Sequence, residues 1–194
     1  GPARTALATN LLKYAWGFAS SGPTSKFKPH PALRVNAMLL LGEMNQSEES
    51  RSGNKRAPVP SATARRLLLK AWDDAKFPPP LQVAILVGLG RHVMLDRVQP
   101  ANSKMSAEDR TTITSAMQTL LDTSEPQGNL SAEGLVWMRR QAMEILADLQ
   151  LQGAPQEQFT QSLTGVLADE KNNLSFRCAA AATLGKVTLP ESHK

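Results

Sequence analysis

Hydrophobic residues recur along this chain at intervals of three and four, which is the spacing of one face of an α-helix. A ten-residue pattern with this spacing first occupies residues 33–42. It has a large apolar residue first, a long polar residue second, apolar residues fifth and ninth, and Gly or Ala tenth. Without gaps, the pattern recurs at 81–90, 138–147 and 176–185. This recurrence predicts an array of helical repeats.

Each copy of the pattern follows another segment with helical spacing, so the sequence predicts four helix pairs in a single repeat domain covering 1–194. Their expected bounds are about 5–45, 61–95, 107–150 and 156–187. Residues 46–60 are polar, charged and interrupted by prolines, without apolar periodicity. They are predicted to form a long flexible loop.

The apolar faces of these helices define the expected core. The second helices of the pairs have inward stripes at Leu33-Ala37-Leu41-Met44, Leu81-Ile85-Leu89-His92, Met138-Ala142-Leu146-Leu149 and Phe176-Ala180-Leu184-Val187. Only His92 breaks their apolar character. In the first helix, the inward residues are Leu7, Leu11, Leu12, Ala15, Trp16 and Ala19. The alternation of large and small residues predicts that neighbouring helices approach closely, and an aromatic content of only 5% favours helix over sheet.

The repeated pattern resembles HEAT repeats, especially the phycobilisome-lyase type, whose second helix carries an apolar-Arg pair, then Ala, then Leu-Gly. The closest matches are Leu33-Arg34, Ala37 and Leu41-Gly42, and Phe176-Arg177, Ala180 and Leu184-Gly185. The resemblance covers about residues 5–187. It implies an all-α fold, an α-solenoid (alpha-alpha superhelix) of about four helix pairs in a right-handed stack.

The sequence departs from this family at one row of residues. The family often has Asp three residues before the apolar-Arg pair, where it bonds to Arg side chains along the stack. This chain has His30, Pro78, Leu135 and Asn173 at the four positions. Arg34, Arg139 and Arg177 are therefore expected to contact helix C-terminal carbonyls, other acids or solvent.

Charge is distributed unevenly along the chain. Residues 1–100 have 14 Lys or Arg against 6 Asp or Glu, whereas residues 101–194 have 8 against 11. A basic half can attract nucleic acid or anionic lipid, and a solvated surface is the simpler interpretation.

Catalysis receives little support from the sequence. The histidines are scattered, no metal-binding or phosphate-loop motif is present, and the acidic pairs fall at helix ends or in loops. Cys178 has no second cysteine for a disulfide and is expected to be a small core residue. We therefore predict a protein that is not an enzyme, with no cofactor, no metal and no membrane span.

The candidate binding site is a groove along the second helices, beside the core stripe. The flanking residues are Asn36, Leu40, Glu43, Ala84, Gly88, Arg91, Gln141, Ile145, Asp148, Ala179, Thr183 and Lys186. Trp137 and Arg140 join them, because the polar neighbourhood of Trp137 predicts partial exposure. The predicted partner-contacting set is Asn36, Glu43, Arg91, Trp137, Arg140, Gln141, Asp148 and Lys186.

Trp16 and Trp72, at equivalent positions of two first helices, are expected to pack in the core, with stacking on a base as the alternative.

The favoured function is a non-catalytic scaffold that binds a protein or peptide in this groove. Nucleic-acid binding through the basic half is the alternative, as in HEAT-like DNA glycosylases, and Trp72 with Asp73 or Trp137 with Asp148 are the combinations it would use. The family name alone suggests a lyase-like or chaperone-like role toward a bilin or other cofactor protein. Gly1-Pro2 matches the remnant of a cleaved tag, so the natural N-terminus is expected to differ and the compartment is not indicated. The residues do not indicate the partner or the oligomeric state either.

Overall fold

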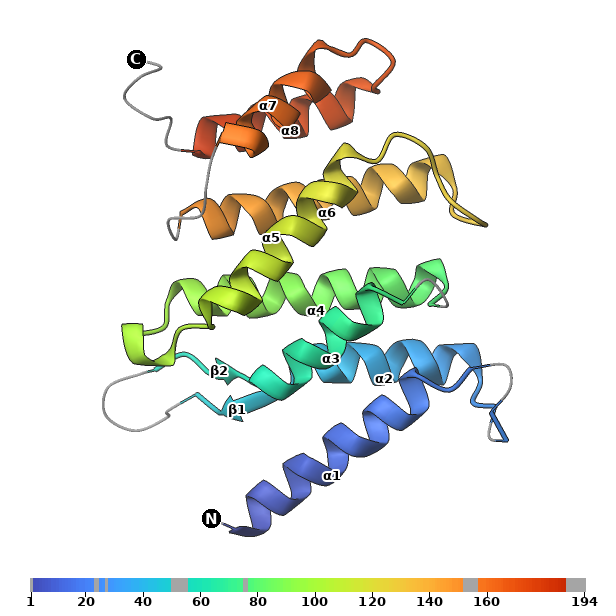
Figure 1. The fold of residues 1–194 in the computed structure, drawn as a ribbon, viewed down its shortest axis with the longest axis vertical. Coiled ribbons are helices and arrows are strands. Elements are labelled where there is room, and N and C mark those ends of the chain that lie inside the picture. Colours follow the sequence, from blue (N-terminus) through green and yellow to red (C-terminus); the bar gives the residue numbers. More distant parts are fainter. Residues whose placement is uncertain are drawn as a thin grey trace. The chain divides into compact units, whose positions relative to one another are not determined.

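The structure is a computed structural model that describes residues 2–22, 25–26, 28–49, 56–74, 77–151 and 157–187, with side chains from residue 6 onward. The described chain is mostly helical (Figure 1). Its helices are α1 (Pro2–Ala19), α2 (Pro31–Glu43), α3 (Ala62–Trp72), α4 (Pro79–Arg97), α5 (Ala107–Asp122), α6 (Ala132–Gln150), α7 (Glu157–Ala168) and α8 (Leu174–Lys186). The all-α prediction is confirmed, because the described residues are mostly helical and contain little strand.

Contacts divide the chain into two compact units, Gly1–Met105 and Ser106–Lys194. The sequence predicted one repeat domain, and the arrangement of the two units as a single array stays a prediction. Each unit contains two helix pairs. In the first unit α2 packs against α1, α3 and α4, and in the second unit α8 packs against α6 and α7.

The helix starts follow from local chemistry. The hydroxyls of Ser61, Ser106 and Ser131 each accept a hydrogen bond from a backbone N–H in the first turn of α3, α5 and α6. Asn173 does the same for α8. These side chains satisfy donors that have no partner within the helix, so they fix where each helix begins.

A short antiparallel hairpin joins the first two pairs. Its strands are β1 (Asn45–Ser47) and β2 (Val59–Pro60), and Asn45 is paired with Pro60. The two ends of the segment predicted to be a loop, 46–60, are therefore strands. Residues 50–55 lie outside the described residues, so the flexibility expected of this segment stays a prediction.

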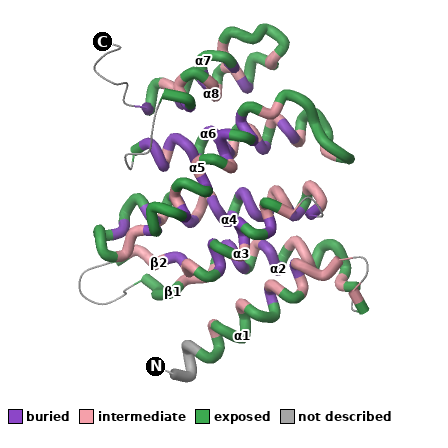
Figure 2. Tube along the Cα trace, viewed as in Figure 1, coloured by how far each residue is buried: buried purple, intermediate pink, exposed green. Residues whose placement is uncertain are grey.

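The core of the first unit depends on a close approach between α2 and α4. A Cβ atom added to Gly42 would lie 2.6 Å from the Cα atom of Gly88, and one added to Gly88 would lie 2.9 Å from the Cα atom of Gly42. Around this contact Met38, Leu41 and Leu89 are fully buried (Figure 2). The predicted close approach of neighbouring helices is thus confirmed for α2 and α4.

The arginines of the apolar-Arg pairs contact the C-terminal carbonyls of the preceding helices. Arg34 donates to the carbonyl oxygen of Ala19 at 3.3 Å, Arg139 to that of Leu121 at 2.9 Å, and Arg177 to that of Leu167 at 2.9 Å. A cation at this end of a helix complements both the unpaired carbonyls and the helix dipole. These contacts, called arginine clasps below, confirm the first of the three expected environments.

Arg139 also links the two pairs of the second unit. Its guanidinium lies 4.7 Å from the ring centre of Phe176, in a cation–π contact between α6 and α8. Burial lowers the pKa of Arg139, and the carboxylates of Asp122 and Asp169 act to raise it. Arg139 therefore binds the C-terminal end of α5 and also contacts α8.

Replacing Arg139 with methionine is expected to lower the free energy of unfolding by about 2 kcal/mol. The variant loses a charge-assisted hydrogen bond and a cation–π contact but keeps much of the apolar stem. The adjacent Arg140→Met is the control, because Arg140 is exposed and this change should cost less than about 0.5 kcal/mol. Urea denaturation followed by circular dichroism measures both, and equal losses would contradict a stabilising role for the clasp.

Three expectations about the core are wrong. Leu7 and Leu11 of α1 are exposed, because only the last part of this helix, from Ala15 onward, buries residues. Leu33, expected to begin the inward stripe of α2, is 42% exposed, because the buried residues of this helix begin one turn later, at Ala37. Cys178 is exposed rather than in the core, since it lies on the solvent side of α8, away from the buried Phe176 and Ala180.

Candidate functional site

The predicted site residues of the first unit lie on the outer sides of two adjacent second helices. Asn36 and Glu43 are exposed on α2, and Arg91 is half-buried on α4. Arg91 joins the two helices, because its Nε atom lies 2.9 Å from Oε2 of Glu43. The structure therefore brings Glu43 and Arg91 together.

The side chain of Arg91 is held by three acceptors. Besides Glu43, it donates to the carbonyl oxygen of Gly42 at 3.2 Å and to Oδ1 of Asn45 at 3.0 Å. An arginine held in this way gives a fixed position to a polar group at the surface. Its charge is largely compensated within the protein.

Exposed apolar side chains share the helix faces of Glu43 and Arg91. Leu40 lies three residues before Glu43, while Val87 and Met94 lie four before and three after Arg91, spacings that put each on the same helix face as its neighbour. They are 43%, 40% and 49% exposed. We call the surface formed by Leu40, Glu43, Val87, Arg91 and Met94 the α2–α4 face.

Part of the expected groove is buried instead. Ala84 and Gly88 were predicted to flank the core stripe, yet both are buried, and Gly88 lies in the contact between α2 and α4. Ile145 and Thr183 are also buried. The prediction was wrong there because α4 and α6 bury a wider arc than one stripe. Val87 and Met94 were missed, although their spacing from Arg91 would have indicated them.

Behind the α2–α4 face, His92 is fully buried. Its Nε2 atom lies 3.1 Å from the carbonyl oxygen of Gly42, which can only accept, so Nε2 carries the proton. Burial, assisted by the positive charges of Arg65 and Arg91, lowers the pKa of His92 from 6.5 to about 3. The ring is therefore neutral near pH 7, and its Nδ1 atom has no hydrogen-bond partner among the described residues.

A small cavity of about 60 Å³ lies beside His92. Polar side chains of Arg65, Asp96 and Lys104 line it, together with apolar groups of the hairpin and Met105. Lys104 donates to the carbonyl oxygens of Asp96 and Arg97 at 2.6 and 3.0 Å. Lys104 therefore connects the end of α4 to the turn that follows this helix, which is a structural role.

The predicted site residues of the second unit share the exposed side of α6. Trp137 is 39% exposed, as its polar neighbourhood predicted. Arg140 donates to Ser175 at 3.3 Å, and Gln141 donates to Glu144 at 3.4 Å. Asp148 is half-buried two turns further along α6. These residues form a polar surface with one aromatic side chain.

Lys186 lies apart from this group. It is exposed in the last turn of α8, eleven residues after Ser175, a distance of about 16 Å along a helix. Arg140 therefore contacts the first turn of α8, through Ser175, whereas Lys186 lies in the last turn of the same helix.

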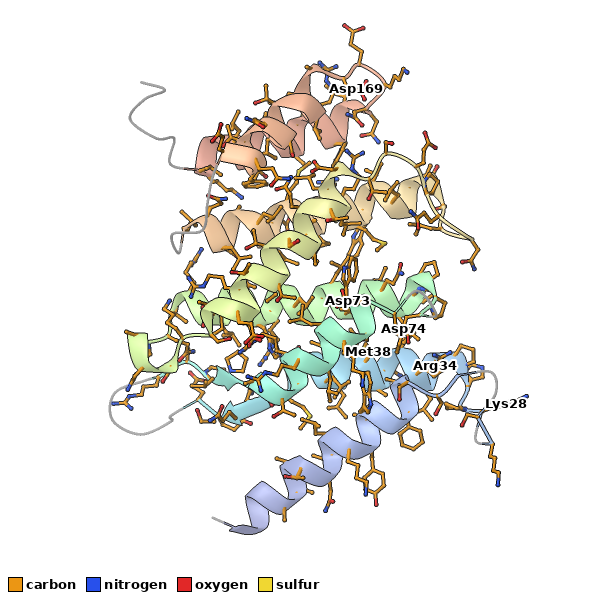
Figure 3. All side chains as sticks on the ribbon, viewed as in Figure 1. Lys28, Arg34, Met38, Asp73, Asp74 and Asp169 are labelled. Carbon is orange, nitrogen blue, oxygen red and sulfur yellow. The ribbon has the colours of Figure 1, made fainter. Side chains whose placement is uncertain are left out.

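The structure separates one of the two side-chain combinations considered for base excision. Trp137 and Asp148 are eleven residues apart on one helix, about 16 Å along its axis. Asp73 follows the last residue of α3, where it is exposed (Figure 3). Trp16, the counterpart of Trp72, stacks on Phe77 with ring centres 6.4 Å apart. Within the described residues, no group of three or more His, Cys, Asp or Glu could hold a metal ion.

Comparisons with known protein families, with curated proteins and with solved structures found no match. The HEAT-repeat resemblance thus rests on the residues of this chain and stays a prediction. Among the described helices, none combines the length and apolar character needed to cross a membrane.

Proposed function

We propose that this chain is a HEAT-like α-solenoid that binds a protein or peptide and has no catalytic role of its own. Two features support this proposal. The second helices of the pairs contact each other within each unit, α2 with α4 and α6 with α8, as stacked repeats do. The arginine clasps give three of the four pairs the same internal contact.

The observation that carries the binding proposal is the α2–α4 face. Three apolar side chains that are each at least 40% exposed share the helix faces of an ion pair whose geometry is fixed by further hydrogen bonds. Protein-binding sites commonly combine apolar anchors with polar groups that are already positioned. A peptide could bury Leu40, Val87 and Met94 while its backbone or a polar side chain contacts Glu43 and Arg91.

The nucleic-acid alternative is less well supported. Cations of the basic half have partners within the protein, since Arg34 contacts a helix end and Arg91 pairs with Glu43. Arg65 is buried. Phosphate binding requires cations that are accessible and arranged in a row.

The test is a selection of peptides from a random display library on the immobilised protein. Peptides that bind the native chain should bind the variant Leu40→Gln/Val87→Gln at least about tenfold more weakly, because two apolar anchors are lost. The control is Leu174→Gln/Leu151→Gln, which changes two exposed apolar residues of the second unit and should keep the affinity. Isothermal titration calorimetry with the selected peptides measures all three proteins.

Peptides that bind both variants equally would show that the α2–α4 face is not the binding surface. A titration with duplex DNA at low and high salt tests the alternative. Tight binding at low salt that weakens steeply with added salt, together with no selectable peptide, would replace the proposal.

A further inference from the structure

The first part of α1 exposes an apolar stripe that no other described segment covers. Leu7, Leu11 and Tyr14 are 60%, 43% and 63% exposed, and their spacing of four and three puts them on one face of the helix. Phe18, half-buried, continues the same stripe by one turn. Three large exposed apolar side chains in succession on one helix indicate a contact surface.

The segment of the chain that contains this stripe is basic. Residues 1–42 contain five basic residues, Arg4, Lys13, Lys26, Lys28 and Arg34, and no Asp or Glu. Lys13 precedes Tyr14 on α1, and Lys28 extends from the segment between α1 and α2 (Figure 3). Lys70 of α3 lies 6.0 Å from the ring centre of Trp16. The first acidic residue of the chain, Glu43, pairs with Arg91.

From this combination we propose that the stripe of α1 binds an acidic amphipathic helix of a partner protein. The apolar side of that helix would cover Leu7, Leu11 and Tyr14, and its carboxylates would face Lys13 and the lysines after α1. A helix that carries apolar residues at intervals of three and four matches the spacing of the stripe. This surface is independent of the α2–α4 face.

Two other occupants fit less well. A membrane surface is bound by helices with a wide apolar side and a row of Lys or Arg on the other side, whereas this stripe is one residue wide and Lys13 is the one basic side chain described on α1. A second copy placed against the same face would bring two acid-free regions together, which like-charge repulsion disfavours.

The test uses a synthetic helix of about 20 residues with leucines along one side and glutamates beside them. A matched peptide has lysines in place of the glutamates. We expect the acidic peptide to bind the native chain, to bind more weakly as salt rises, and to bind the variant Leu11→Asn/Tyr14→Asn at least about tenfold more weakly. Ala6→Asn, an exposed change beside the stripe that leaves its apolar residues intact, should keep the affinity.

Fluorescence anisotropy of the labelled peptides gives these affinities, and circular dichroism checks that the variants remain helical. Equal affinity for the acidic and basic peptides, or for the native chain and the double variant, would overturn the proposal. Binding to phosphatidylserine vesicles without binding to the acidic peptide would assign the stripe to a membrane surface instead. A dimer in sedimentation velocity that the double variant abolishes would assign it to a second copy.

Discussion

Replacing Gly42 with alanine is expected to destabilise the first unit by about 2 kcal/mol. Alanine normally favours a helix interior over glycine by about 1 kcal/mol. Here its Cβ atom would lie 2.6 Å from the Cα atom of Gly88, so the backbones of α2 and α4 must separate. Overpacking of this kind costs from about 1 to 3 kcal/mol or more, and the contact involves backbone atoms that cannot rotate away. Gly88→Ala should have a similar effect, since its Cβ atom would also approach Leu68.

The same substitution at two other helical glycines provides the control. Gly17 and Gly165 have no atom within 4 Å of an added Cβ atom, so alanine there should stabilise the chain by up to about 1 kcal/mol. Thermal unfolding followed by circular dichroism compares the variants. If Gly42→Ala were as stable as Gly17→Ala, the close approach of α2 and α4 would be disproved.

Acid is expected to destabilise the native chain through His92. The pKa of His92 is about 3 in the folded protein and near 6.5 when unfolded, so between these values the unfolded state binds a proton that the folded state does not. The stability contributed by the neutral ring is complete above about pH 7 and is lost progressively as the pH falls toward 3. Between about pH 7 and pH 4 this loss amounts to about 3 kcal/mol.

The variant His92→Leu should lack this part of the pH dependence. Leucine suits the site, because the equivalent residues of the other second helices are Met44, Leu149 and Val187. The carbonyl of Gly42, which loses the His92 bond, still accepts from Arg91. Urea denaturation across this pH range measures both proteins. Parallel curves for the native chain and His92→Leu would show that His92 does not sense acid.

Helical spacing was sufficient to predict the helices. The four copies of the ten-residue pattern lie within α2, α4, α6 and α8, because each copy carries the core residues of one helix. The pairing of β1 with β2 was not predictable, since it involves five residues without apolar periodicity.

The candidate site was predicted less completely. Asn36, Glu43 and Arg91 could be placed beside the core stripe by counting along a helix, but the width of the buried arc depends on how closely the next helix packs. Gly88 illustrates this difficulty, because its partner Gly42 is 46 residues away and occupies a different position of the pattern. The neutral state of His92 also depends on burial and on two arginines that the sequence alone does not bring together.

The arginine clasps have a consequence for how the chain folds. Their residues are separated by only 15, 18 and 10 positions in the sequence, so closing these contacts costs little chain entropy. Contacts of such short range form rapidly, which allows a helix pair to assemble before its neighbours are in place. The second pair has Gln82 at the corresponding position, and its α3 and α4 both contact α2. Folding of the first unit is therefore expected to proceed outward from the pair that has its own clasp.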